Sequence, residues 1–177
     1  MSNRTTGLRR AAIWVALVLI AMFPGLVQAQ CRDTSLDLRG NWGQAQFSVE
    51  VVDSPETRNR GLMFRETMGR WAGMLFVYEE PGRAVFWMRN TLISLDLIFM
   101  DPAGIVTRVH TDAVPMDETP IDGGAGILYV LEVNAGVAAR LGIAAGTEMR
   151  HARVDPGLAA WPCEGASSGL PSAVPGR

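Results

Sequence analysis

The sequence predicts an α+β fold that is mainly β: a small antiparallel, barrel-like or sandwich-like domain with two short helices. The 177-residue chain contains about seven short segments with the apolar alternation of strands, and two short segments with helix start and stop signals. It has neither the strand–helix–strand rhythm of a parallel sheet nor an internal repeat. A hydrophobic content of 48% fits one globular domain with a substantial core.

The first predicted strand and helix follow a lead-in segment, residues 30–43. Segment 44–52 alternates, with three apolar side chains on one face, as a half-buried strand does. Ser54 and Pro55 then supply the N-cap and first position of a helix, and Gly61 is suited to its C-cap. We expect a helix of one or two turns here.

The middle of the chain is predicted to form four strands separated by turns. They are expected at 73–79, 84–88, 92–100 and 105–110. Pro81-Gly82 predicts the turn between the first two, and the segment Asp101-Pro102-Ala103-Gly104 predicts a hairpin between the last two.

The C-terminal part begins with a predicted long loop, 111–126, rich in Pro, Gly and acidic residues. A strand is expected at 127–133, a short helix capped by Asn134 and ended by Gly142, and a last strand at 147–154. The resulting organisation is a signal peptide at 1–29, a lead-in segment at 30–43, a single domain at 44–154 and a flexible tail at 155–177 that Cys163 anchors.

The N-terminal segment has the composition of a secretory signal peptide. Three arginines precede an uncharged apolar run at 11–23, and Val27-Gln28-Ala29 offers small residues to a signal peptidase. An uncleaved membrane anchor is the alternative, but the apolar run is shorter than the ~20 residues that span a bilayer. A lipid-modified Cys31 is a weaker alternative, because Gln30 precedes it. We therefore expect a periplasmic or secreted protein that touches a membrane only if this segment is retained.

The charge of the chain limits the classes of partner that it could bind. All 16 basic residues are arginine, and three of them precede residue 30, so the expected mature chain has 13 arginines, 18 acidic residues and a net charge of −5. An acidic chain without a basic run is a poor candidate for binding nucleic acid. The absence of lysine excludes Schiff-base chemistry on a lysine.

The two cysteines predict one disulfide. Cys31 and Cys163 lie near opposite ends of the expected mature chain, and an even pair in an exported protein is usually bridged. A loop of this length could contribute roughly 4–5 kcal/mol to stability. Two free thiols remain the alternative.

Asp96 is the one carboxylate inside a strongly apolar strand. Alternation places it on the face opposite Leu95 and Leu97. It could be paired with an arginine, for which Arg60, Arg65 and Arg89 are the nearest candidates by element order, or it could act as a general base in a cleft.

The run Phe86–Asn90 combines aromatic, thioether, guanidinium and amide groups. Phe86 and Met88 could belong to the core while Trp87 lies against Arg89, or Trp87, Arg89 and Asn90 could form the floor and donors of a pocket.

Methionine suggests a further site. Thioethers select Cu(I), so Met63 and Met88 could hold copper, although methionine is also the flexible filler of irregular cores. Only His110 and His151 are available as imidazole ligands or bases, and no zinc, phosphate-loop or serine-hydrolase motif occurs. We expect no cofactor.

Three blocks of the sequence together resemble the family called domain of unknown function 192. The blocks are TRNRGLMFRETM, GMLFVYEEPGRAVFWMRNTLISLDLIFMDPAGIVTRV and YVLEVNAGVAARLGIAAGTEM, and the resemblance covers about residues 44–150. The matching motif positions are Arg58, Gly61, Leu62, Met63 and Arg65; Phe86, Trp87, Met88, Asn90 and Thr91; Leu95, Asp96, Phe99 and Asp101; and Leu131, Glu132, Ala135 and Gly136. Arg89 and Ser94 stand where relatives often have lysine and proline. The resemblance implies a compact, mostly β domain, commonly exported in bacteria, and brings no agreed activity or ligand.

The leading functional hypothesis is an exported, non-catalytic module that binds a small molecule or an envelope protein. Its expected polar cleft is formed by Arg58, Arg65, Trp87, Arg89, Asn90 and Asp96. One alternative is a hydrolase or lyase in which Asp96 is the base and Arg65 or Arg89 clamps an anion. Another is a Cu(I) carrier that uses Met63 and Met88. A third alternative is that the motif residues serve only to encode the fold.

Overall fold

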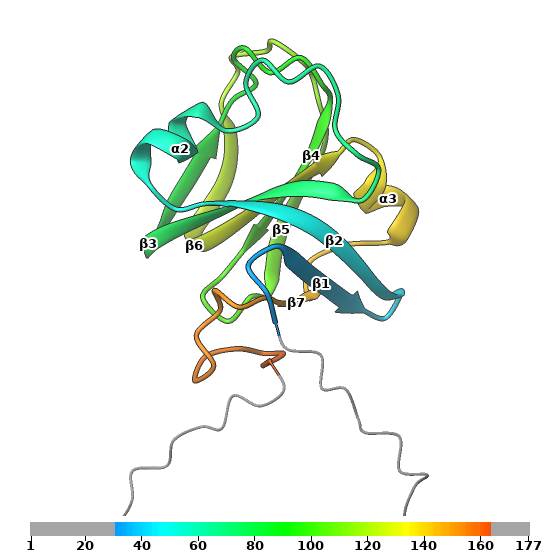
Figure 1. Ribbon diagram of the computed structural model, residues 1–177, viewed down its shortest axis with the longest axis vertical. Coiled ribbons are helices and arrows are strands. Elements are labelled where there is room, and N and C mark those ends of the chain that lie inside the picture. Colours follow the sequence, from blue (N-terminus) through cyan, green and yellow to red (C-terminus); the bar gives the residue numbers. More distant parts are fainter. Residues whose placement is uncertain (1–30, 164–177) are drawn as a thin grey trace, which may run out of the picture.

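The computed structural model describes residues 31–163, which form one curled, barrel-like sheet with two short helices (Figure 1). The strands and helices are β1 (Ser35–Gly40), β2 (Gly43–Val52), α2 (Pro55–Arg60), β3 (Ala72–Phe86), β4 (Leu95–Met100), β5 (Val106–Ala113), β6 (Ile121–Asn134), α3 (Val137–Leu141) and β7 (Glu148–Arg150). The predicted mainly β class and the two helices are confirmed. The predicted signal peptide, 1–29, lies outside the described residues.

The sheet has the strand order β5-β4-β6-β3-β2-β1-β7. The Val106 N–H donates to the Thr147 carbonyl at 2.8 Å and the Met149 N–H to the Gly104 carbonyl at 2.8 Å, so β7 also bonds to the chain at the start of β5. The two edges of the sheet therefore meet, which leaves less open strand edge for unwanted pairing.

Several boundaries differ from the predicted ones. The lead-in segment contains β1, and Pro81-Gly82 is not a turn but part of a continuous β3 whose pairing with β6 shifts register near Gly82 and Ala84. These β-bulges absorb a proline that cannot donate to the ladder. The predicted loop 111–126 is shorter, because β5 extends to Ala113 and β6 begins at Ile121.

One strand pair is parallel, contrary to the predicted antiparallel sheet. β2 and β3 run in the same direction, and the chain between them crosses over the sheet through α2. A parallel pair requires such a crossover. Ser54 and Thr57 form a capping box that starts α2, as expected from Ser54 and Pro55, and Gly61 ends it at a φ of 47°.

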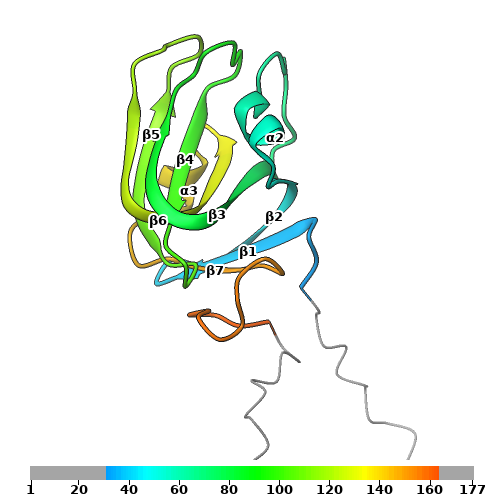
Figure 2. The same ribbon diagram turned by 90° about the vertical axis from the view of Figure 1, so that its left-hand side faces the viewer.

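Alternation along the central strands produces a hydrophobic cluster on each face of the sheet. The α2-side core includes Leu62, Met74, Phe76, Leu97 and Val130, and the α3-side core includes Leu75, Ile98, Leu131, Val133 and Ala138. Figure 2 shows α2 and the chain after it standing against one side of the curled sheet. The crossover therefore seals the first of these clusters.

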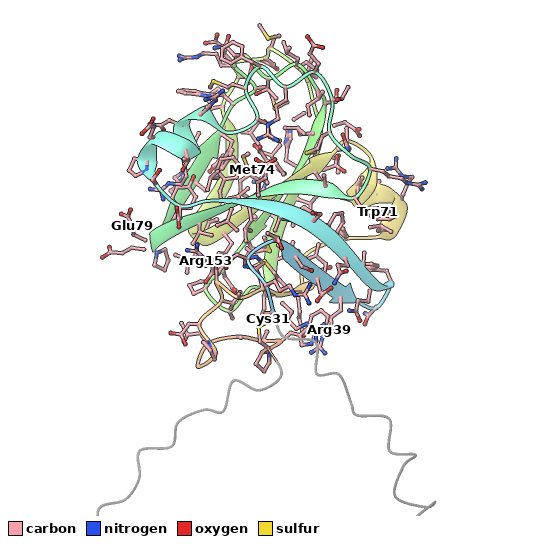
Figure 3. The ribbon with its side chains drawn as sticks, viewed as in Figure 1. Cys31, Arg39, Trp71, Met74, Glu79 and Arg153 are labelled. Atoms are coloured by element: carbon pink, nitrogen blue, oxygen red, sulfur yellow. A yellow bond between two sulfur atoms is a disulfide. The ribbon has the colours of Figure 1, made fainter. Side chains whose placement is uncertain are left out.

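The chain ends of the described domain are joined by the predicted disulfide. Cys31 and Cys163 are bridged with their Cα atoms 5.7 Å apart (Figure 3). Residues 155–163, expected to belong to the flexible tail, fold back on the domain: the Ala160 N–H donates to the Ala103 carbonyl, and Trp161 lies against the guanidinium groups of Arg39 and Arg150. The remainder of the predicted tail lies outside the described residues.

Candidate functional site

A cavity of about 460 Å³ lies between the α2 crossover, the outer part of β3 and the segment that leads to β4. This volume is within the range of small-molecule sites. Its lining residues are Arg58, Asn59, Arg60, Gly61, Leu62, Met63, Phe76, Tyr78, Val85, Phe86, Trp87, Arg89, Thr91 and Glu132. Three of the six predicted binding residues, Arg58, Trp87 and Arg89, are thus brought together, with Met63 beside them.

Arg58 is the most firmly held of these side chains. It projects from α2, and its Nη1 donates to the carbonyls of Asp53 and Val77, the second at 2.9 Å. Its Nη2 is 3.6 Å from a carboxylate oxygen of Glu79, and the guanidinium lies 5.0 Å from the centre of the Tyr78 ring. The side chain is 13% exposed. These contacts orient a positive charge at the cavity wall in advance of any ligand.

Glu132 also lines the cavity, and it is buried. It lies on β6, level with Met74 on β3 and Leu97 on β4, so its side chain enters the α2-side core among apolar neighbours. Only 5% of the residue is exposed. Burial raises the pKa of the Glu132 carboxyl to about 8, which leaves it mainly protonated at neutral pH. Within residues 31–163 this carboxyl has neither a hydrogen-bond nor an ion-pair partner, and since no fully buried side-chain oxygen in this range lacks a partner, its oxygens reach the cavity.

The sequence-based site did not include Glu132, although the resemblance covers it as a motif residue. The available signal was an acidic residue within the apolar run Val130–Val133. Such a residue is expected to be either paired or protonated when buried. Only the pairing of β6 with β3 and β4 places it at the cavity.

The rim of the cavity carries two further arginines. Arg89 lies 5.5 Å from the Trp87 ring centre, and Arg60 is exposed at the end of α2. Neither has an acidic partner within 4 Å in the part of the chain that the structure describes. Burial also raises the pKa of Tyr78, so its hydroxyl stays protonated at neutral pH. With Glu132 neutral, the titratable groups that line the cavity carry only positive charge.

Asn90 shapes the rim without lining the cavity. Its φ is 55°, a left-handed conformation that asparagine tolerates better than most residues, and its carbonyl accepts from the N–H of Phe64, whose φ is 65°. The Asn90 Nδ2 is 4.0 Å from the Met63 sulfur. Two strained loop residues are therefore fastened together beside the site.

Asp96 occupies a different environment from the one expected. It is fully buried on β4, and its carboxylate accepts from the backbone N–H groups of Asp112, Gly136 and Ala138 at 3.0, 3.1 and 2.8 Å. Of the two roles considered for Asp96, pairing with an arginine is therefore wrong, because its partners are backbone N–H groups. Asp112, at a φ of 54° near the end of β5, directs its N–H toward β4. Asp96 lies outside the cavity and joins three parts of the backbone.

Arg65 and Met88 also lie away from the cavity. Arg65 forms a two-bond ion pair with Glu50, with N–O distances of 2.5 and 2.6 Å, and this pair lowers the pKa of the Glu50 carboxyl. Met88 is 1% exposed and packs in the α2-side core, whereas Met63 faces the cavity.

Residues 31–163 contain neither a cluster of metal-binding side chains nor a membrane-spanning helix. No group of three or more His, Cys, Asp or Glu side chains is arranged to hold a metal ion there. Within the same range, no helix has the length and apolar character needed to cross a bilayer.

The predicted helix cap at Asn134 is also corrected. Asn134 is the last residue of β6, and its side-chain amide donates to the Gly69 carbonyl at 2.9 Å, which fastens the crossover to the sheet. The N-cap of α3 is Gly136, whose own N–H bonds to Asp96.

Comparison with known proteins places the chain in a family. It is similar to a solved protein of unknown function from Novosphingobium aromaticivorans, at 41% identity and a TM-score of 0.64 over 65% of this chain and 82% of that one. A protein from Sinorhizobium meliloti, described as a proposed transcription regulator, is 34% identical with a TM-score of 0.65 over 68% and 95% of the two chains. No curated protein matches. The model of domain of unknown function 192, described as "Uncharacterized ACR", matches residues 37–151, so the chain belongs to this family.

Proposed function

We propose that this protein is exported and binds a small molecule, without transforming it, in the cavity beside α2. The observation that carries the proposal is that one cavity is lined both by a pre-oriented guanidinium, Arg58, and by a carboxyl, Glu132, that has no partner in the described residues. Because the Glu132 oxygens reach the cavity and are not sealed in the core, a ligand in the cavity can complete their hydrogen bonding.

The groups at the cavity favour binding over catalysis. Among the described lining residues there is no serine, cysteine or histidine, and the Thr91 hydroxyl already donates to the Arg89 carbonyl at 3.4 Å. Asp96, the candidate base, is enclosed by backbone donors and does not line the cavity. A general base must reach the proton that it removes.

Export is supported by two independent features. Residues 1–29 have the charge and apolar pattern of a signal peptide, and Cys31 and Cys163 form a disulfide, which persists in oxidising compartments. The proposed location is the periplasm or the exterior. We propose no nucleic-acid partner for this acidic chain.

Native mass spectrometry of the protein purified from its own cell envelope tests this proposal. Under gentle conditions we expect an organic adduct that is released, chemically unchanged, on denaturation, and an N-terminus at Gln30. Two matched variants localise the adduct. Val85→Trp fills the cavity from a half-exposed lining position, whereas Val114→Trp adds the same side chain at an exposed position outside it.

The adduct should disappear in Val85→Trp and persist in Val114→Trp. Loss in neither variant would place the ligand elsewhere, and an envelope protein without any adduct would contradict small-molecule binding. A copper isotope pattern that depends on Met63 would instead favour the Cu(I) carrier.

A further inference from the structure

We infer that the ligand is a small organic carboxylate with an apolar body, whose carboxylate lies between the Arg58 guanidinium and the Glu132 carboxyl group, with Glu132 as a hydrogen-bond donor. This inference rests on the proposed function, since it names the ligand class of the same cavity. Three features support it: the charge of the lining residues, the ability of Glu132 to donate a hydrogen bond, and the apolar character of the other lining residues.

The charge of the lining selects an anion. Arg58, Arg60 and Arg89 line the cavity, and the only acid among its lining residues is Glu132. The nearby carboxylate of Glu79 is 3.6 Å from Arg58 and 78% exposed, so solvent screens it. A cationic ligand would face three guanidinium groups with no opposing carboxylate, and its entry would be disfavoured.

Glu132 then determines which kind of anion completes the site. A protonated carboxyl can donate one hydrogen bond, and an ionised carboxylate can only accept. A ligand carboxylate therefore complements both Arg58 and a neutral Glu132. A ligand that offers only donors would leave the O–H of Glu132 unpaired, which is costly in a buried site.

The number of fixed donors favours a carboxylate over a phosphate. Arg58 is the only lining arginine that is largely buried and held by two backbone carbonyls, while Arg60 and Arg89 are exposed at the rim. A guanidinium edge and one O–H can satisfy the two oxygens of a carboxylate. A phosphate dianion has three terminal oxygens and a second charge, for which this wall holds no further buried cation.

The other lining residues indicate that the ligand also has an apolar part. Phe76, Phe86 and Trp87 supply aromatic surface, and Leu62, Met63 and Val85 supply aliphatic or thioether surface. Trp87 is 51% exposed, Val85 52%. Exposed apolar groups at a cavity mouth gain by covering a ligand, because both surfaces then leave water.

Isothermal titration of the purified mature protein with three probes of similar shape tests the ligand class. The probes are phenylacetate, its neutral amide phenylacetamide, and phenyl phosphate. We expect phenylacetate to bind at least about tenfold more tightly than either of the others, because only it matches both donors with one charge. Phenylacetamide or phenyl phosphate binding as tightly as phenylacetate would overturn the inference.

The dependence of phenylacetate affinity on pH tests the role of Glu132. The charged and titratable groups that line the cavity with it are Arg58 and Arg60 on α2, Tyr78 on β3 and Arg89 before β4. A guanidinium group is not deprotonated in proteins, and burial raises the pKa of Tyr78 further above the range from pH 6 to 9. Affinity should be constant from pH 6 to 7 and fall, approaching tenfold per pH unit, above about 8 as Glu132 ionises.

Glu132→Gln keeps a neutral donor in nearly the same shape. It should bind phenylacetate within about threefold of the wild type at pH 7 and show no fall above pH 8. A profile in the variant that parallels the wild type would show that Glu132 does not touch the ligand.

Arg58→Met should weaken phenylacetate binding about tenfold or more, through loss of the charge-assisted bonds. Arg83→Met is the matched control, because Arg83 is exposed, pairs with Asp122 and lies outside the cavity. Equal weakening in both variants would contradict the placement of the carboxylate.

The proposed function and the ligand class fail in different ways. If the envelope protein carries an adduct that Val85→Trp removes, but phenylacetate does not bind, the cavity is a binding site and the carboxylate assignment is wrong. If neither an adduct nor probe binding is found, both proposals are wrong.

Discussion

Two buried carboxyl side chains, Asp96 and Glu132, lie on neighbouring strands but differ in their hydrogen bonding. Asp96 pairs with Val133 in the ladder between β4 and β6, and Glu132 pairs with Leu97, so the two side chains leave opposite faces of the sheet. Asp96 accepts three backbone hydrogen bonds, whereas Glu132 has no partner in the described residues and is mainly protonated.

This contrast shows that burial of an acidic side chain does not by itself identify a functional site. The three N–H donors around Asp96 come from β5, from the N-cap of α3 and from α3 itself, so the carboxylate organises the backbone. Glu132 forms no hydrogen bond to the described residues, and its side chain lines a cavity. A carboxyl with free hydrogen-bonding capacity is the better candidate for contact with a ligand.

Removing the Asp96 carboxylate should produce the largest effect. Asp96→Ala leaves the N–H groups of Asp112, Gly136 and Ala138 buried without an acceptor, and we expect the free energy of unfolding to fall by about 4 kcal/mol. Urea denaturation monitored by tryptophan fluorescence measures this loss. Asp122→Ala is the control, because this carboxylate accepts one backbone N–H and pairs with the exposed Arg83, and its loss should be much less destabilising. Equal losses in the two variants would remove the structural role assigned to Asp96.

Changing Glu132 should alter how stability depends on pH. The folded-state pKa of about 8 exceeds the ordinary value of 4.5, so between these values the unfolded chain releases a proton that the folded chain retains. The contribution of Glu132 to the free energy of unfolding is therefore largest below pH 4.5 and declines as pH rises to 8, by an amount on the order of a few kcal/mol.

Glu132→Gln lacks this titration, so urea unfolding of the variant and the wild type should diverge as pH is raised, with the variant gaining relative stability. Parallel curves from pH 4.5 to 8 would mean that Glu132 is not desolvated in solution as it is in the structure.

An apolar replacement of Glu132 should separate stability from binding. Glu132→Leu removes a desolvated carboxyl that has no hydrogen-bond partner in the described residues, and we expect about 1 kcal/mol of added stability at pH 7.5, by thermal or urea unfolding. The same variant should lose phenylacetate binding, as functional sites often trade stability for activity. A variant that is destabilised by more than about 2 kcal/mol would indicate a structural role for Glu132 after all.

The smallest expected effect is the energetic coupling between the two acids. Asp96→Asn and Glu132→Gln act on opposite faces and share no hydrogen-bond partner, so their effects on unfolding should add to within about 0.5 kcal/mol at pH 7. A double-mutant cycle gives this value. A larger coupling would show that the two faces of the sheet communicate through the β4–β6 ladder.

Much of the fold follows from local patterns. The cap at Ser54 and Pro55, the alternation in β2 and the cysteine pair each led to a structural feature that is present. These signals succeed because they depend on neighbouring residues or, for the disulfide, on the pairing of the only two cysteines. The Pro81-Gly82 turn failed because tertiary pairing of β3 with β6 made a bulged strand more favourable.

The site was only partly accessible from the sequence. Three residues from two short motifs, Arg58, Trp87 and Arg89, line one cavity. Arg65 and Asp96 were grouped with them, but Arg65 binds Glu50 and Asp96 binds backbone. Which charged group meets which partner depends on strand order, and strand order is not encoded in local spacing.

The sequence by itself determined the mainly β class, the two helices, the disulfide and the residue types available to a site, because local backbone preferences and side-chain chemistry are properties of short segments. Only the tertiary structure decided the roles of the two acids. The ladder between β4 and β6 turns Asp96 toward three N–H groups and Glu132 toward a cavity, and a carboxyl in an apolar surrounding takes its protonation state from the partners that the fold supplies.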